Sequence, residues 1–189
     1  MVQLARPHQT ARLTLRAFQL GDLDDLAVIF ADEGVNRYLY SSPRDRTATR
    51  EALERRVAIS PEVEEENLLC VAIVLRETDH LIGDFMLRWR ADEHRQGEIG
   101  GSLHPDFHGR GYASEVYDEL LELAFVDYGL HRVVGRCDAR NTASIRALEK
   151  AGLRREARFV ENEFVKGEWT NEIVLALRRT EWELTRAAR

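Results

Sequence analysis

The sequence contains little of what secreted, membrane-bound or metal-binding proteins need. Only two of its 189 residues are cysteines, and Cys70 and Cys137 lie in separate apolar segments without the spacing of a redox pair or a metal site. The longest apolar run, LLCVAIVL at 68–75, is far too short to span a bilayer. The opening segment lacks the apolar core of a signal peptide. We therefore expect a cytoplasmic protein that uses neither a metal nor a membrane.

A stripe of basic residues is also missing. The 27 Lys and Arg residues are interspersed with 33 Asp and Glu residues, which gives a net charge of −6. This distribution excludes nucleic acid as an expected partner. The chain has no Pro-rich or Gly/Ser-rich linker, and its length suits one sizeable core. We expect a flexible N-terminus over 1–10 and a single domain over 11–185.

Hydrophobic periodicity predicts a mixed α/β fold. Strands are expected at 12–18, 68–75, 80–89, 97–103, 131–138 and in a hairpin over 158–177 that turns at Lys166–Gly167. Helices are expected at 22–30, at 48–59, from 112 to a stop at Gly129, and at 141–151. The unbroken apolar run at 68–75 is typical of a strand that is covered on both faces. Helices should therefore pack on both sides of the sheet.

One segment indicates an anion site. LHPDFHGRGYASE, residues 103–115, places a Pro-containing loop and two glycines between a predicted strand and an amphipathic helix. The first N–H groups of a helix are unpaired and carry a partial positive charge, and glycine lets a phosphate approach the backbone. A tight turn from strand to helix that needs glycine for positive φ explains the same residues equally well.

Two other phosphate-binding patterns fit this segment poorly. The P-loop pattern is absent from the sequence. GRGYAS has only the first two glycines of a dinucleotide-binding fingerprint, with Ser114 in the third position. Asp138, the candidate ribose ligand, lies further along the chain than the usual distance of about twenty residues.

The same segment resembles the cofactor loop of GNAT N-acetyltransferases. These enzymes carry Gln or Arg, two residues, Gly, one residue, then Gly or Ala; His108, Gly111 and Ala113 occupy these positions, with His in place of Gln or Arg. Other segments resemble the RimJ/RimL-type branch of ribosomal-protein N-terminal acetyltransferases and follow in the same order: ARLTLRAF, VNRYL, LIGDF, EIGGSLHP, NTASIRALEKAGLR and VKGEWTNEIVLAL. The resemblance implies a GNAT fold, with a mixed, mostly antiparallel, splayed sheet of about seven strands flanked by helices on both faces.

The resemblance also implies where acetyl-coenzyme A (acetyl-CoA) binds. Its pyrophosphate would contact the amides of the loop, and its pantetheine arm would pair with the strand before the loop as an added strand does. Asn141 would hold the arm or the reacting region. The implied cofactor-binding residues are Ser102, Leu103, His108, Gly109, Arg110, Gly111, Tyr112, Ala113 and Asn141.

The candidate catalytic residues are Ser144 and Glu98. By resemblance, Ser144 protonates the departing thiolate, although Asn141 and Ser144 also fit the simpler roles of an N-cap and a first-turn residue. In many GNAT enzymes the general acid is a Tyr four residues after the position of Ser144, but this chain has Leu148 there. Glu98 is the candidate base, acting directly or through water, whereas Glu115, in the first turn of the helix that starts at 112, is explained by the helix dipole.

The predicted activity is transfer of acetyl from acetyl-CoA to a primary amine by direct attack in a ternary complex, without a metal. By resemblance, the acceptor is the N-terminal α-amine of a protein or peptide. Two alternatives stay open: a small-molecule amine such as an amino acid, polyamine or antibiotic as acceptor, and a catalytically weak binding module that responds to CoA. The sequence leaves open whether the chain forms a homodimer.

Overall fold

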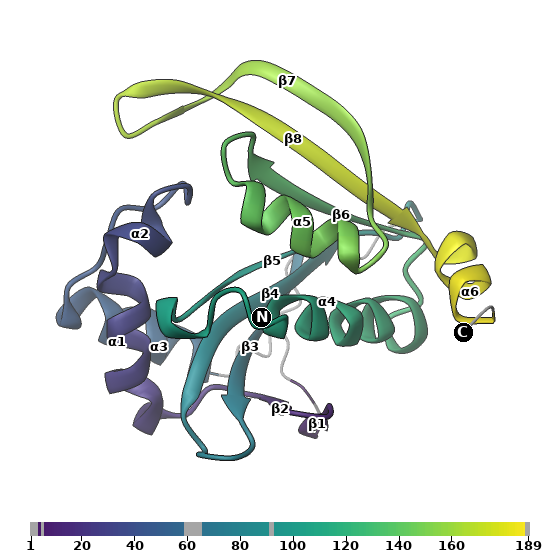
Figure 1. Cartoon of the computed structure of the whole chain (residues 1–189). Helices are drawn as coiled ribbons and strands as arrows, with labels where there is room; N and C mark the ends of the chain where they lie inside the picture. The colour runs from purple at the N-terminus through teal and green to yellow at the C-terminus, as the bar shows by residue number, and fades with distance from the viewer. Residues whose placement is uncertain (1–3, 5, 59–65, 91–92, 188–189) are drawn as a thin grey trace.

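The computed structural model describes residues 4, 6–58, 66–90 and 93–187, which are organised around one eight-stranded sheet (Figure 1). The strands are β1 (His8–Gln9), β2 (Leu13–Arg16), β3 (Glu66–Leu75), β4 (Leu81–Arg90), β5 (Gln96–Leu103), β6 (Arg132–Asp138), β7 (Arg154–Val165) and β8 (Glu168–Arg178). The α-helices are α1 (Leu23–Ala31), α2 (Glu33–Asn36), α3 (Arg46–Val57), α4 (Tyr112–Glu122), α5 (Thr142–Lys150) and α6 (Arg179–Ala187).

The sheet is mixed and mostly antiparallel, as predicted. Its strand order is β1-β2-β3-β4-β5-β6-β8-β7. Only β5 and β6 pair in parallel, and they occupy the middle of the sheet. The predicted count of about seven strands is one short, because the two-residue β1 pairs with β2 through His8 and Leu15. Thus ordered structure begins inside the segment 1–10 that the sequence predicts to be flexible; residues 1–3 and 5 lie outside the described residues.

Helices cover both faces of the sheet, as predicted. α4 and α5 lie on one face, where Val116, Leu120 and Ile145 join the larger hydrophobic cluster together with inward-facing strand residues. α1 and α3 lie on the other face, where Leu26 and Leu53 belong to a second cluster (Figure 1). Each fully buried aliphatic side chain of this kind contributes roughly 1.5–3 kcal/mol of transfer free energy.

Several boundaries differ from the predicted ones. The hairpin turns at Lys166–Gly167, as predicted, with positive φ at both residues, but its strands begin four residues earlier, at Arg154. α4 ends at Glu122 and continues as a π-helical segment, Leu123–Asp127, before the predicted stop at Gly129. The helix predicted at 48–59 is α3, which begins at Arg46; residue 59 lies outside the described residues. Among the described residues, no helix is both long and apolar enough to cross a membrane.

Candidate active site

The sheet opens between β5 and β6. β5 pairs with β4 as far as Leu103, but it pairs with β6 only from Gln96 to Glu98. Beyond Glu98 the parallel strands separate, while β6 stays paired with β8 as far as Asp138. Within the described structure, the side of β5 that faces this gap therefore has no strand partner, as at the edge of a sheet. An extended ligand can pair with such an edge.

Glycine keeps this part of β5 bare. A Cβ atom on Gly101 would lie 2.4 Å from Cγ of Phe85 on the neighbouring strand β4. Real Cβ contacts are never so short, so a side chain at this position would displace the aromatic ring. The neighbouring Gly100 adds no side chain either. Gly100 and Gly101 therefore leave the backbone of β5 without side chains in the middle of the gap.

The loop after β5, here called the cradle, has the glycine geometry that its sequence predicts. Gly109 and Gly111 have φ values of +73° and +81°, which residues with a Cβ rarely adopt. Gly111 is the N-cap of α4, so the unpaired amides of the first turn face the loop. A Cβ atom on Gly109 would meet nothing within 4 Å, which leaves room for an anion beside the backbone. This arrangement fits the pyrophosphate of CoA.

Two cations that sequence reasoning missed lie beside the cradle. A Cβ atom on Gly111 would be 3.7 Å from Nη2 of Arg12 and 3.9 Å from Nζ of Lys150. Arg12, in the bend directly before β2, donates from Nη1 to the carbonyl oxygen of Arg110 at 3.0 Å. Its Nη2 is paired with Oε2 of Glu115 at 2.6 Å. These cations come from both flanks of the loop and add positive charge to it.

His108 fastens the loop to β5. Its Nε2 lies 2.9 Å from the carbonyl oxygen of Leu103, and an Nε2–H tautomer donates to this carbonyl. The guanidinium of Arg110 lies 5.5 Å from the ring centre of Phe107. Both side chains therefore have contacts within the loop itself. The backbone, the helix terminus and the neighbouring cations are the groups that the loop offers to a ligand.

A pocket of about 590 Å³, here called the splay pocket, connects the cradle with the gap. It brings together most of the predicted site residues: Ser102, Leu103, His108, Gly109, Gly111, Tyr112, Ala113, Asn141 and Ser144. Val35, Tyr38 and Leu39, which lie between α1 and α3, form another wall. The sequence did not single out Tyr38 or Tyr117, which also lines the pocket. The lining in the described structure does not include Arg110 or Glu98.

The start of α5 confirms Asn141 as an N-cap and places it beside the splay pocket. Its Oδ1 accepts from the backbone N–H of Ser144 at 3.1 Å, as an N-cap does. Its side chain also lines the splay pocket. The Ser144 hydroxyl lines the pocket too and has no hydrogen-bond partner among the described residues. Leu148 is 1% exposed, and its Cδ1 would lie 2.7 Å from a Cβ on Gly135. Leu148 is therefore a core residue.

Glu98 belongs to a row of alternating charges that crosses the sheet. Its Oε1 lies 3.8 Å from Nη2 of Arg88 on β4, and its Oε2 lies 3.7 Å from Nε of Arg136 on β6. Arg136 in turn pairs with Glu172 on β8 at 3.1 Å. Neighbouring residues of a strand face opposite sides of the sheet. Each charged residue of the row has a sequence neighbour in the hydrophobic cluster under α4 and α5: Ile99, Leu87, Cys137 and Ile173. The row therefore lies on the opposite face.

Glu172 joins this row to the wall of the splay pocket. Its side chain is only 3% exposed, and the hydroxyl of Tyr40 donates to its Oε1 at 3.0 Å. Asn162 donates to Oε2 at 3.2 Å. Tyr40 directly follows the pocket residues Tyr38 and Leu39. A second contact holds the same segment, because Nζ of Lys166 in the hairpin turn donates to the carbonyl oxygen of Asn36.

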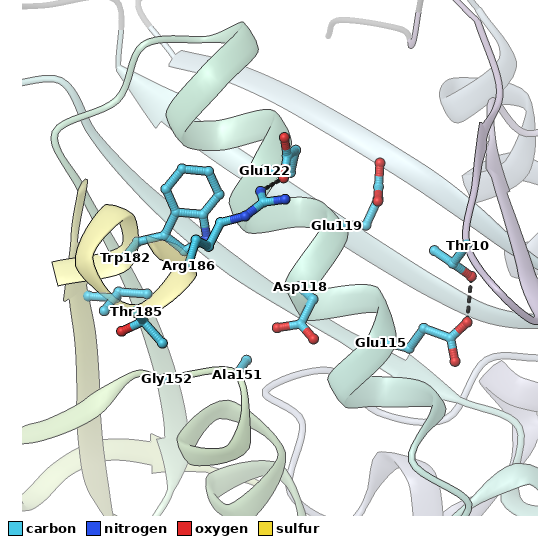
Figure 2. Close-up of a pocket in the computed structure, with 11 residues that line it drawn as sticks. Thr10, Glu115, Asp118, Glu119, Glu122, Ala151, Gly152, Trp182, Thr185 and Arg186 are labelled. Carbon is cyan, nitrogen blue, oxygen red and sulfur yellow. Dashed lines mark hydrogen bonds and ion pairs between the residues drawn. The ribbon is translucent and has the colours of Figure 1, made fainter. Parts of the chain in front are cut away.

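A second hollow, here called the acidic groove, lies along another side of α4 (Figure 2). Its volume is about 470 Å³, and four carboxylates of α4 line it: Glu115, Asp118, Glu119 and Glu122. Thr10 donates to Glu115 at 2.5 Å, His8 lies 2.8 Å from Glu119, and Arg186 of α6 pairs with Glu122. Burial acts to raise the pKa of Glu115, but hydrogen bonds from Thr10 and Arg12 outweigh it and lower the pKa. Among the described residues, the groove and the splay pocket share no lining residue.

Comparison with known proteins identifies the class of enzyme that this fold and loop define. Residues 12–154 match the model of the acetyltransferase (GNAT) domain. The uncharacterized N-acetyltransferase YnaD of Bacillus subtilis is 30% identical over 174 residues, which cover 92% of this chain and 97% of that protein. The chain belongs to the GNAT family of N-acetyltransferases, enzymes that use acetyl-CoA and act on amines.

Other relatives extend the comparison. The spermidine N(1)-acetyltransferase of Vibrio cholerae is 23% identical over 168 residues, covering 84% of this chain and 88% of that protein. A GNAT-family acetyltransferase from Bacillus anthracis has the same fold, with a TM-score of 0.81 at 24% identity over 93% of this chain and 99% of that one.

Proposed function

We propose that this chain transfers acetyl from acetyl-CoA to the N-terminal α-amine of a protein or peptide, as enzymes of the RimJ/RimL-type branch do. The observation that carries the donor part is the splay pocket, which connects an anion cradle at the start of α4 with an unpaired side of β5. A polar loop next to an unpaired strand edge suits a ligand that has a pyrophosphate and an extended arm, which supports the proposal. Both lie within the 11–185 segment, which we treat as the catalytic domain.

The residues of the pocket divide the binding of acetyl-CoA between them. The amides of the loop and of the first turn of α4 hold the pyrophosphate, with Arg12 and Lys150 supplying positive charge. Ser102 and Leu103 offer backbone groups to the arm, and the Asn141 side chain faces the same pocket. His108 and Arg110 hold the loop in shape. No metal takes part in this proposal.

The chemistry is direct attack of the amine on the thioester carbonyl. Glu98 lies where β5 and β6 separate and accepts the proton of the amine, directly or through water. A backbone N–H of β5 that faces the gap stabilises the charge that develops on the carbonyl oxygen. Ser144, whose hydroxyl has no described protein partner, donates to the departing thiolate. The thiol has an ordinary pKa of about 8.5, so this step needs little assistance.

Glu98 is the single candidate base among the described residues, which favours an α-amine as the acceptor. An amine of pKa about 7.8 needs only about 1 kcal/mol to be neutral at pH 7, whereas a lysine of pKa about 10.4 needs nearly 5 kcal/mol. Glu98 is 27% exposed and lies between two arginines. Glu172, the other carboxylate of the described row, is also paired with an arginine, Arg136. The same alternation of charges offers no surplus of carboxylates for a polycation such as spermidine.

The test offers the enzyme acetyl-CoA and a peptide that has a free N-terminus and one internal lysine. Mass spectrometry with fragmentation locates the acetyl group, and a parallel reaction contains spermidine instead of the peptide. We expect acetylation of the N-terminus at neutral pH. Predominant modification of the lysine, or a faster reaction with spermidine, would contradict the proposal that the acceptor is an N-terminal α-amine. CoA binding without transfer to any amine would instead support a binding module.

A further inference from the structure

Tyr117 is a buried tyrosine of α4 that faces the splay pocket. Only 4% of the residue is exposed, and it is one of the residues that line the pocket. Its ring packs edge-on against Phe85, with 5.4 Å between ring centres and an interplanar angle of 70°. The ring is therefore fixed by packing, and the position of its hydroxyl is fixed with it.

Within the described structure, the hydroxyl of Tyr117 is unpaired. No described residue forms a hydrogen bond with it. Yet within the described structure, every side-chain nitrogen or oxygen that is sealed from solvent does have a partner. The Tyr117 oxygen is therefore not sealed, and because the rest of the residue is buried, the pocket is the space that the oxygen reaches. The hydroxyl is therefore available to water or to a ligand in the pocket.

The neighbours of Tyr117 place it along the gap between β5 and β6. Phe85 pairs with Gly101 of β5. On the other side, Tyr117 belongs to the same hydrophobic cluster as Cys137 of β6. Gly101 lies between the cradle, which follows Leu103, and Glu98, where the strands separate. Tyr117 therefore borders the middle of the path from the cradle to the proposed reaction centre.

We propose that the Tyr117 hydroxyl donates a hydrogen bond to the pantetheine arm of acetyl-CoA and so positions the thioester at the gap. This inference rests on the proposed function, because it requires acetyl-CoA in the splay pocket. The arm is an extended chain with amide carbonyl groups, which are the acceptors that a phenol can meet halfway along the gap. Asn141 and Ser144 line the pocket from α5, whereas Tyr117 approaches from α4.

The environment keeps Tyr117 a donor. Burial raises the pKa of its phenol, and the nearby Cys137 adds to this effect. The hydroxyl is therefore protonated throughout the neutral range. A hydrogen bond between neutral groups contributes modestly, and its loss corresponds to at most about a tenfold change in affinity. The role of Tyr117 is thus to hold the arm, and no proton transfer is assigned to it.

The experiment compares the wild type with Tyr117→Phe, which removes the oxygen and keeps the ring against Phe85. Calorimetry measures binding of CoA and of adenosine 3′,5′-bisphosphate, which lacks the arm. Steady-state kinetics give KM for acetyl-CoA and for the amine. Tyr128→Phe is the matched control, because Tyr128 packs against Trp89 with 4.3 Å between ring centres and does not line the pocket in the described structure.

We expect Tyr117→Phe to raise Kd for CoA and KM for acetyl-CoA by roughly fivefold to tenfold. Binding of the bisphosphate, KM for the amine and the melting temperature of the free protein should stay unchanged, as should all values for Tyr128→Phe. Unchanged CoA affinity would overturn the inference, and so would an equal loss for the bisphosphate or a lowered melting temperature. If the wild type itself does not bind CoA, the proposed function fails first.

Discussion

The splay pocket and the acidic groove both border α4, but their polar groups differ in one respect. In the groove, Glu115, Glu119 and Glu122 each have a partner on another segment. In the pocket, the hydroxyls of Tyr117 and Ser144 have none among the described residues. Polar groups with complete hydrogen bonding hold a fold together, whereas incomplete ones are available to a ligand. Substitutions in the groove should therefore change stability, and those in the pocket should change binding or turnover.

The largest effect is expected at the cradle. Gly111→Val introduces a β-branched side chain where φ is +81° and where the pyrophosphate should approach the backbone. We expect Kd for acetyl-CoA, measured by calorimetry, to rise roughly a hundredfold, equivalent to about 2.7 kcal/mol. Gly129→Val is the control, because Gly129 also has positive φ, +62°, but lies outside the pocket. Both variants should lose about 1–2 kcal/mol of stability from backbone strain. Equal CoA affinity in the two variants would contradict this placement.

Glu98→Gln tests the proposed base. The amide keeps the shape of the side chain but cannot accept a proton, so kcat should fall by roughly a hundredfold, while Kd for CoA stays constant. Glu119→Gln makes the same change in the acidic groove, where Glu119 contacts His8, and should leave kcat unchanged. If the two variants turn over equally fast when chemistry is rate-limiting, Glu98 is not the base.

Ser144→Ala should have a smaller effect on turnover. Its hydroxyl acts only as the thiolate develops, so kcat should fall more than CoA affinity does. We expect about a tenfold decrease, because a thiol of pKa about 8.5 leaves readily. Stopped-flow measurement of thiol release separates this step from product dissociation. A normal rate of thiol release would exclude Ser144 from the mechanism.

Glu172→Gln and Glu156→Gln compare the two ends of β6. Glu172 pairs with Arg136 beside the pocket wall, whereas Glu156 pairs with Arg132 at the far end of the strand. Loss of the Glu172 charge should loosen Arg136 and the Tyr40 segment, and raise KM for the amine roughly fivefold. Glu156→Gln should leave KM unchanged. Equal KM values for the amine in both variants would show that the Tyr40 segment does not contribute to acceptor binding.

The smallest effect is expected in the acidic groove, and it depends on pH. Because the folded pKa of Glu115 is lowered, its contribution to stability is present above the unfolded value of about 4.3 and is lost as pH falls through the folded value. Glu115→Gln should reduce the free energy of unfolding by about 1 kcal/mol at pH 7. Denaturant titration should show this difference disappearing at low pH. Glu183→Gln, which removes an exposed ion pair on α6, should reduce the free energy of unfolding at pH 7 by less than half as much.

The sequence predicted the features that depend on local chain conformation. Gly109 and Gly111 indicate positive φ directly, and an N-cap such as Asn141 is recognisable from its type and position. The contact between Tyr40 and Glu172 spans 132 residues, and Arg12 reaches Arg110 across 98. Such pairs follow from how helices and strands pack, so composition and spacing did not indicate them. Nothing in the sequence marks Tyr117, because its open hydroxyl is visible only beside Phe85 and the pocket.

The short pairing of β5 with β6 has a thermodynamic consequence. Only three residues of β5 pair with β6, so the two halves of the sheet are joined along much less than the length of either strand. An arm bound in the gap, as proposed, would supply hydrogen bonds that the protein leaves unmade and would act as a linkage between the halves. Resistance to unfolding would then rise with donor concentration, as RT ln(1 + [L]/Kd). Amide exchange along 99–103 would slow in parallel, making the cohesion of the sheet a readout of the acetyl-CoA supply.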